Sequence, residues 1–160
     1  MHVKFKKHFG VYGTCIKDRK LLCIQKNAGP YRGRYDLPGG SQEIGEGLTE
    51  TLVREVLEET GYRVISYANP RVYDVFVKEE TELFTVHHLM ALYTIELDSQ
   101  QLQLPTVVSD GLNDSDAAVW VDFSRLTLEN ASPLVLKVKE EFLGQATMDK
   151  TTYPNWHVIH

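Results

Sequence analysis

The chain of 160 residues has few cysteines, no long apolar run and no excess of positive charge. Its two cysteines, Cys15 and Cys23, cannot form a disulfide framework, and because both lie in apolar runs we expect buried, reduced thiols. No stretch approaches the roughly 18 consecutive apolar residues of a membrane span, and no signal-peptide core follows the basic N-terminus. These absences predict a cytoplasmic protein that does not associate with membranes.

Acidic residues outnumber basic ones, with 22 Asp and Glu against 17 Lys and Arg, which gives a net charge of −5. This balance disfavours a surface that coats nucleic acid, so we expect no stable nucleic-acid binding. The length predicts one domain over residues 1–145. The remaining tail, 146–160, contains apolar residues that need cover. We expect it to dock on the domain or on a partner subunit, which would make the protein a homodimer.

Apolar and polar runs alternate in a pattern of short strands with two helices. Residues 9–16 and 21–24 are apolar runs around a polar turn, which predicts a β-hairpin. Further strands are expected at 64–65, 72–77, 84–97 and 119–121, and helices at 47–60 and 133–143. A long polar loop, 98–116, precedes the last strand. The pattern predicts an α/β (α+β) fold in which a mixed sheet is covered by helices.

Three carboxylates converge on one face of the first expected helix. Glu55, Glu58 and Glu59 are spaced i, i+3 and i+4, so their side chains share one arc of the helix. They repel one another, and two lie near the C-terminal end, where the helix dipole disfavours negative charge. A solvated acidic face is one interpretation. The other is a site for a hard divalent cation, Mg²⁺ or Mn²⁺ as a substitute, since such cations prefer carboxylate oxygens.

The residues around the carboxylates favour the metal site. They follow the spacing G-x5-E-x7-R-E-U-x-E-E-x-G-U, where U is bulky and apolar, with fixed residues Gly40, Glu46, Arg54, Glu55, Glu58, Glu59 and Gly61. This pattern resembles the Nudix box, and every fixed residue matches. Tyr62 stands where an aliphatic residue is usual and keeps the bulk. Leu37-Pro38-Gly39-Gly40 before the box and Trp120-Val121-Asp122 after it also resemble the family's framework.

The resemblance implies a Nudix-type α/β/α sandwich that hydrolyses a nucleoside diphosphate linked to another moiety, with a divalent metal. The family's metal-binding positions correspond to the backbone carbonyl of Gly39 and the side chains of Glu55, Glu58 and Glu59. Arg54 matches a residue that pairs with Glu46 and anchors the preceding loop on the helix.

The general base has two candidates. Glu55 is the first choice, because the family pattern places it between metal and water. In some family members an acid from a distant loop does this work, and here the loop offers Asp110, Asp114 and Asp116. Asp114 is the best placed of these, six residues before Trp120, although the family more often has Glu there.

Substrate-binding candidates come from the loop before the box and from the strands. Arg32 and Arg34 flank this loop, where a cation can hold a phosphate, although solvated loop charges are an equal alternative. Tyr31 and Phe76 can stack on a base, although aromatic residues in strands more often belong to the core. The resemblance therefore implies a nucleotide-type small molecule as the substrate.

His87 and His88 are adjacent in an expected strand, so they face opposite ways and one of them points inward.

Several motifs of Nudix subfamilies are absent. We find no proline at the downstream position typical of many ADP-ribose hydrolases, and no motif of members that cleave dinucleoside polyphosphates, NADH or coenzyme A. Nucleoside triphosphates and nucleotide sugars remain as substrates. Two alternatives are a non-catalytic regulatory module that binds a nucleotide or metabolite, and an isomerase of the isopentenyl diphosphate type. The complete set of box carboxylates disfavours the first, and the lack of a convincing cysteine–glutamate pair disfavours the second.

Overall fold

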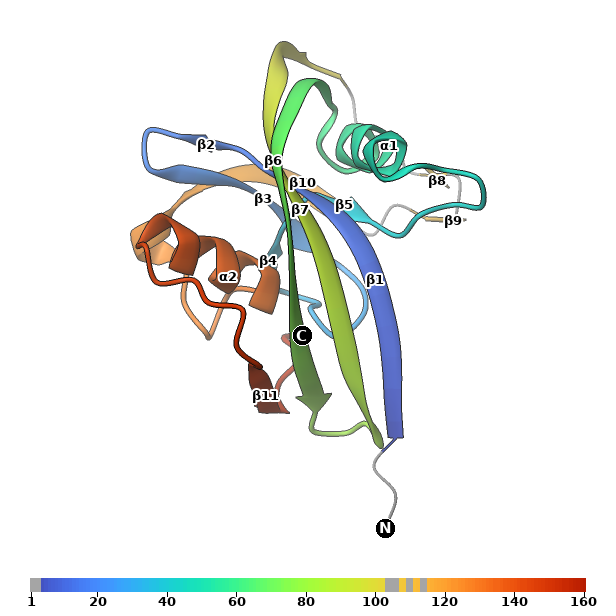
Figure 1. Cartoon of the computed structure of the whole chain (residues 1–160), viewed down its shortest axis with the longest axis vertical. Coiled ribbons are helices and arrows are strands. Elements are labelled where there is room, and N and C mark those ends of the chain that lie inside the picture. Colours follow the sequence, from blue (N-terminus) through green and yellow to red (C-terminus); the bar gives the residue numbers. More distant parts are fainter. Residues whose placement is uncertain (1–3, 103–106, 109–110, 113–114) are drawn as a thin grey trace.

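The structure, a computed structural model, describes residues 4–102, 107–108, 111–112 and 115–160, with the backbone alone at 107–108, 111–112 and 115–117. Two helices lie on opposite sides of the strands (Figure 1). α1 spans Leu48–Thr60 and α2 spans Pro133–Phe142. Within these described ranges, no helix is long and apolar enough to cross a membrane.

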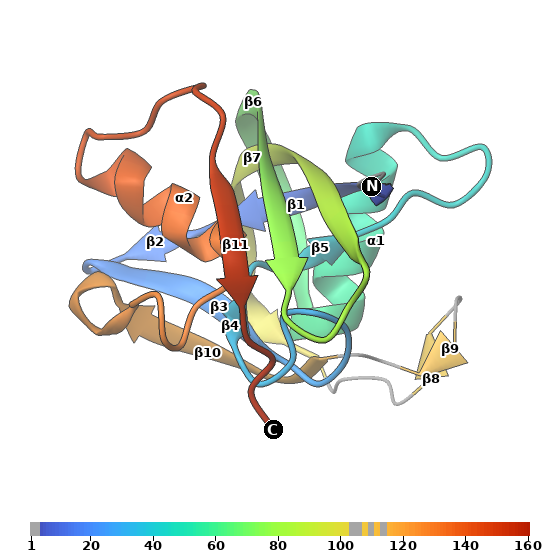
Figure 2. The ribbon, with the colours of Figure 1, turned by 90° about the horizontal axis from the view of Figure 1, so that it is seen from below.

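The larger sheet has five strands in the order β11-β6-β7-β1-β5. Their bounds are β1 Lys4–Thr14, β5 Gly39–Gly40, β6 Tyr62–Glu79, β7 Phe84–Gln101 and β11 Thr152–Trp156. β6 and β7 form a long antiparallel hairpin, whereas β1 runs parallel to β7 and β11 runs parallel to β6 along the sheet edge (Figure 2). The sheet is therefore mixed, and the predicted fold class, a mixed sheet flanked by helices, is confirmed.

The smaller sheet has the order β10-β3-β2, with β4 paired to β3. Its strands are β2 Ile16–Lys17, β3 Lys20–Lys26, β4 Tyr35–Asp36 and β10 Ser115–Asp122, and η1, a 3₁₀ turn, follows at Phe123–Arg125. A short pair, β8 Val107–Val108 and β9 Gly111–Leu112, lies between β7 and β10 in sequence.

The predicted hairpin between residues 9–16 and 21–24 is wrong in its main part. β1 pairs along its whole length with β7 in the larger sheet, and only the short β2 turns back onto β3. The two residues of that turn, Asp18 and Arg19, both have positive φ, as a tight two-residue hairpin requires.

Apolar residues form two cores, because alternate side chains of the larger sheet point to opposite faces. The core that includes α2 contains Val75 and Met90, and the core that includes α1 contains Val11 and Ile95. Both cysteines are buried free thiols, as expected.

The buried face of α1 carries both apolar and acidic side chains. Leu52 and Val56 are fully buried, whereas the apolar Val53 is 37% exposed. Glu55 and Glu59 take its place on the buried face. The helix therefore turns two carboxylates toward the protein, which positions the site described next.

Candidate active site

Arg54 is the centre of a charged cluster on α1. Its Nε donates to Glu46 Oε2 at 2.6 Å and its Nη2 donates to Glu46 Oε1 at 2.8 Å, so the ion pair is bidentate. Nη2 also donates to the backbone carbonyl of Ser41 at 3.1 Å. The hydrogen bonds from Arg54 lower the pKa of Glu46 to about 2, and those to Glu46 raise the pKa of Arg54. The arginine therefore ties the loop before α1 to the helix.

The carboxylates of α1 lie around this arginine and the glycine pair of β5. Arg54 Nη1 donates to Glu55 Oε1 at 2.9 Å and to Glu58 Oε2 at 3.2 Å. Glu59 Oε1 accepts a hydrogen bond from the backbone N–H of Gly39 at 2.7 Å. Glu55 is 7% exposed and Glu59 is 2% exposed. Arg54 and the three carboxylates that it contacts, Glu46, Glu55 and Glu58, form the Arg54 cluster.

Gly39 and Gly40 are positions where a side chain does not fit. A Cβ on Gly40 would lie 2.8 Å from the carboxyl carbon of Glu55, and a Cβ on Gly39 would lie 2.1 Å from the carbonyl oxygen of Val11. Gly39 also has a φ of 146°, which L side chains rarely adopt. The two glycines therefore let the backbone of β5 approach the carboxylates of α1 directly.

These residues fit a divalent metal in their chemistry. Carboxylate oxygens and backbone carbonyl oxygens are the hard donors that Mg²⁺ and Mn²⁺ prefer, and both are present where α1 meets the glycine backbone of β5. In the part of the chain that the structure describes, no three acidic, histidine or cysteine side chains are arranged as a complete metal site. Arg54 Nη1 bridges Glu55 and Glu58 and supplies positive charge there. A metal bound by both carboxylates would require this bridge to open.

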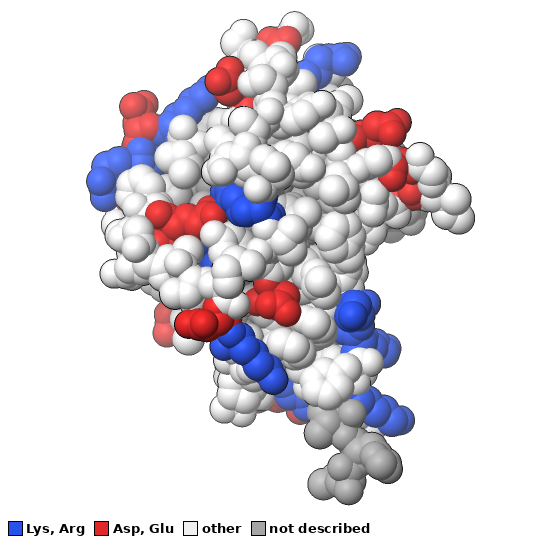
Figure 3. All heavy atoms as spheres, in the orientation of Figure 1, with Lys and Arg blue, Asp and Glu red and all other residues white. Residues whose placement is uncertain are grey.

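Figure 3 shows acidic side chains over the loop before α1 and basic side chains over the N-terminal half of β1. The basic region borders a cavity of about 510 Å³, lined by Lys6, Lys7, His8, Tyr12, Lys26, Ala28, Gly29, Pro30, Tyr31, Asp36, Val86 and His88. Tyr12 also pairs with Gly39 in the β1–β5 register. Tyr12 therefore connects the cavity to the glycine pair of β5, although neither glycine nor any residue of α1 is among the described lining residues.

The buried part of the cavity is built around His88. Its Nε2 lies 2.8 Å from the hydroxyl of Tyr12 and its Nδ1 lies 2.8 Å from the hydroxyl of Tyr31. His88 is 3% exposed, whereas His87 lies on the other face of β7 and contacts Asp74 at 2.6 Å. This confirms that one of the two histidines points inward. Neither Tyr12 nor His88 is among the site residues predicted from the sequence; the two-residue period of the strand is the signal that points to them.

The predicted substrate-binding residues have different surroundings. Tyr31 lines the cavity, and Arg32 is exposed in the loop before β4. Phe76 stacks on His87 with ring centroids 4.1 Å apart, on the face of the sheet opposite to His88. It therefore does not share the cavity with Tyr31.

The structure corrects the expectation that Arg34 contacts a phosphate. It is 4% exposed, and its guanidinium donates to the backbone carbonyls of Leu128, Ala131 and His157. Its guanidinium carbon also lies 3.9 Å from the centroid of the Trp156 ring. These contacts occupy the guanidinium and give Arg34 the role of fastening the C-terminal segment.

Of the loop acids, Asp110 and Asp114 lie outside the described residues, and for Asp116 only the backbone is described.

The fold and the carboxylate helix define a Nudix domain. The chain belongs to the Nudix family, because residues 4–142 match the family's model, described as the NUDIX domain. It is 47% identical over 51 residues to an ADP-ribose pyrophosphatase of Methanocaldococcus jannaschii, over 32% of this chain and 30% of that protein. The chain thus spans about a third of that relative's length.

Two solved structures share the fold. A MutT NUDIX hydrolase from Burkholderia pseudomallei has a TM-score of 0.64 and 18% identity, over 89% of this chain and 99% of that one. The NUDIX domain of Shewanella oneidensis NrtR, solved with ADP ribose, has a TM-score of 0.63 and 19% identity, over 89% of this chain and 90% of that one. At these identities the likeness establishes the fold alone.

Proposed function

We propose that the chain is a Mg²⁺-dependent Nudix pyrophosphohydrolase that cleaves a nucleoside diphosphate linked to another moiety, either a nucleoside triphosphate or a nucleotide sugar. The observation that carries this proposal is the placement of the α1 carboxylates against the glycine backbone of β5, with a cavity for an organic ligand on the other side of Tyr12. Pyrophosphate cleavage requires a bound substrate, neutralised charge on its phosphoryl oxygens and a water made nucleophilic.

Each residue of the site has a proposed role. Glu55, Glu58, Glu59 and the carbonyl of Gly39 would hold the metal, which when bound neutralises phosphoryl oxygens and lowers the pKa of water. Glu55 takes the proton of the attacking water, with Asp114 as the alternative base. Arg54 positions the loop before α1 through Glu46 and holds Glu55 and Glu58 together before metal binding.

The cavity is proposed as the seat of the substrate. Tyr12 and Tyr31 offer aromatic surface for a base, and the exposed Lys6 and Lys7 attract an anion. Arg32 remains a candidate for a phosphate contact. We do not propose Arg34 or Phe76, because the contacts described above use their side chains elsewhere.

A substrate panel with Mg²⁺ tests the proposal. It includes the ribo- and deoxyribonucleoside triphosphates, nucleotide sugars and ADP-ribose, the last because one relative is an ADP-ribose pyrophosphatase and one neighbour binds ADP ribose. We expect a nucleoside monophosphate product from at least one member, and labelling with ¹⁸O-water would show which phosphorus is attacked. No product from any of them would overturn the proposal. A higher melting temperature without turnover would favour the regulatory module, and conversion of isopentenyl diphosphate the isomerase.

A further inference from the structure

Three side chains from distant parts of the sequence form a hydrogen-bonded row in the cavity. Tyr12 comes from β1, Tyr31 from the loop before β4 and His88 from β7, and His88 lies between the two hydroxyls with both contacts at 2.8 Å. The exposed fractions are 4%, 5% and 3% in that order. We name these residues the Tyr–His–Tyr row. Because all three line the cavity and are buried, they form its floor.

With a neutral imidazole, the Tyr–His–Tyr row has three polar protons, two on hydroxyls and one on the ring, but forms two hydrogen bonds. Burial, reinforced by the charges of His8 and Lys26, lowers the pKa of His88 well below its ordinary value, so the imidazole is neutral at pH 7. A neutral imidazole donates from one nitrogen and accepts at the other. The tyrosine that faces the N–H accepts a hydrogen bond and still carries its own hydroxyl proton. In either tautomer, therefore, one hydroxyl proton is available to a third partner.

That third partner is not part of the protein as described. Across the described ranges, neither the Tyr12 hydroxyl nor the Tyr31 hydroxyl makes a hydrogen bond besides the one to His88. Asp36 is the acidic residue among the described lining residues, and its Oδ1 accepts a hydrogen bond from Ser132 Oγ at 2.6 Å. A ligand that enters the cavity can supply an acceptor for the surplus proton.

The floor and the outer part of the cavity differ in their polar groups. The floor presents tyrosine rings and neutral hydroxyls, with the buried Asp36 near them, whereas Lys6 and Lys7 are exposed. A flat neutral ring suits the floor, and an anionic group suits the lysines. A nucleotide has this division between base and phosphates, with the base directed inward.

We propose that the Tyr–His–Tyr row selects the base of the substrate by donating its surplus hydroxyl proton to a ring carbonyl oxygen. The cavity then prefers oxo bases, such as hypoxanthine, guanine and uracil, over amino bases, such as adenine and cytosine. An amino group in the same place offers no acceptor for the surplus hydroxyl proton, and the lysines at the outer part also pair with acceptors rather than donors. This inference rests on the proposed function, because it takes the cavity as the seat of the substrate.

Inosine and adenosine nucleotides test the inference, because their purines differ at the edge that carries a 6-oxo or a 6-amino group. Binding of IMP and AMP to the full chain is measured by calorimetry without added metal, and kcat/KM for ITP and ATP is measured with Mg²⁺. We expect a preference for inosine of about tenfold in each, which is the contribution of one hydrogen bond. A ratio near one or a preference for adenosine would overturn the inference.

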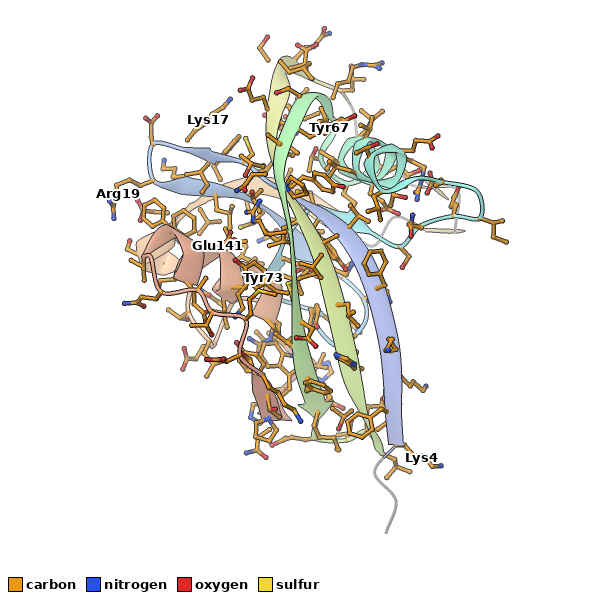
Figure 4. All side chains as sticks on the ribbon, viewed as in Figure 1. Lys4, Lys17, Arg19, Tyr67, Tyr73 and Glu141 are labelled. Atoms are coloured by element: carbon orange, nitrogen blue, oxygen red, sulfur yellow. The ribbon has the colours of Figure 1, made fainter. Side chains whose placement is uncertain are left out.

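The double variant Tyr12→Phe/Tyr31→Phe removes both hydroxyls and keeps both rings, so the inosine-to-adenosine ratio should fall to about one. The matched control is Tyr73→Phe. Tyr73 and Glu141 lie between β6 and α2 (Figure 4), and the Tyr73 hydroxyl donates to Glu141 at 2.7 Å. This control should keep the ratio. A purely structural defect would weaken binding of both nucleotides equally.

An unchanged ratio in the folded double variant would also overturn the inference. If the double variant does not fold, the single variants decide, since at least one must lower the ratio. An inosine preference in binding with no hydrolysis of any nucleotide would contradict the proposed function and support the inference. Hydrolysis without a base preference would support the function and overturn the inference.

Discussion

The Arg54 cluster and the Tyr–His–Tyr row hold their polar groups in opposite ways. The cluster is charged, partly exposed and built from residues close in sequence, between 46 and 58. The row is neutral, buried and built from residues 57 and 76 positions apart. Partly exposed ionic contacts can be exchanged for contacts with water or another ion. When a buried neutral network is disrupted, no water replaces the hydrogen bonds that are lost. The comparison indicates that the cluster suits a change of ligands and the row suits fixed recognition.

The largest expected effect follows from removing the support of the row. Trp156 is 3% exposed, its Nε1 donates to the carbonyl of Pro30 at 2.9 Å, and its ring packs edge-on against Tyr31. Trp156→Ala should lower the free energy of unfolding by about 3–5 kcal/mol, as measured in urea. Met148→Ala, at a position 71% exposed in the same tail, is the control and should change little. Unchanged stability on truncation after Gly144 would contradict a supporting role of this tail.

The next largest effect is expected from a substitution that removes a proposed metal ligand of the Arg54 cluster and leaves the Tyr–His–Tyr row intact. Glu58→Gln keeps an oxygen that can accept the Arg54 hydrogen bond but removes a charge proposed to hold the metal. We expect kcat to fall by about 10²-fold or more with a small change in stability. Glu50→Gln, an exposed position in the first turn of the same helix, is the matched control. Equal activity of the two variants would contradict the role of Glu58.

Arg54→Gln tests whether the arginine neutralises the cluster before metal binding. The substitution leaves Glu46, Glu55 and Glu58 without their shared cation, so the free energy of unfolding should fall by about 2 kcal/mol. Mg²⁺ should then raise the melting temperature more in the variant than in the wild type. An equal rise in both proteins would show that the metal and the arginine do not share these carboxylates.

The smallest effect concerns pH. The folded pKa of Glu46, about 2, lies below its ordinary value of 4.5, so its ion pair stabilises the protein above pH 4.5 and this contribution is lost as the pH falls toward 2. Solvent screening reduces the effect at this partly exposed site. Glu46→Gln should therefore lower the melting temperature by about 2–4 °C at pH 6 and by almost nothing at pH 2. A difference that is the same at both pH values would contradict this.

The cluster was predictable from the sequence because its geometry is local. Helical spacing alone brings Glu55 and Glu58 together, and α1 begins and ends within one residue of the predicted helix. The match to the Nudix box added Arg54, and the structure shows the expected pair with Glu46.

The row was not predictable, because it depends on pairing between strands far apart in sequence. Tyr12 and His88 meet through the parallel alignment of β1 with β7, which replaces the hairpin that neighbouring apolar runs suggested. Arg34 shows the same limit: its position in a loop favoured a phosphate contact, but the C-terminal segment folds back over it and takes its hydrogen bonds. Tertiary contacts thus decided which predicted residues face the cavity.

One measurement tests most directly whether the cluster performs the chemistry and the row selects the base. It compares kcat/KM for ITP and ATP in the wild type, in Glu58→Gln and in Tyr12→Phe/Tyr31→Phe, with Mg²⁺. We expect Glu58→Gln to lower both values by about 10²-fold or more with an unchanged inosine-to-adenosine ratio. The tyrosine variant should instead bring the ratio to about one. A change of ratio in Glu58→Gln, or hydrolysis that does not depend on Glu58, would contradict this division of roles.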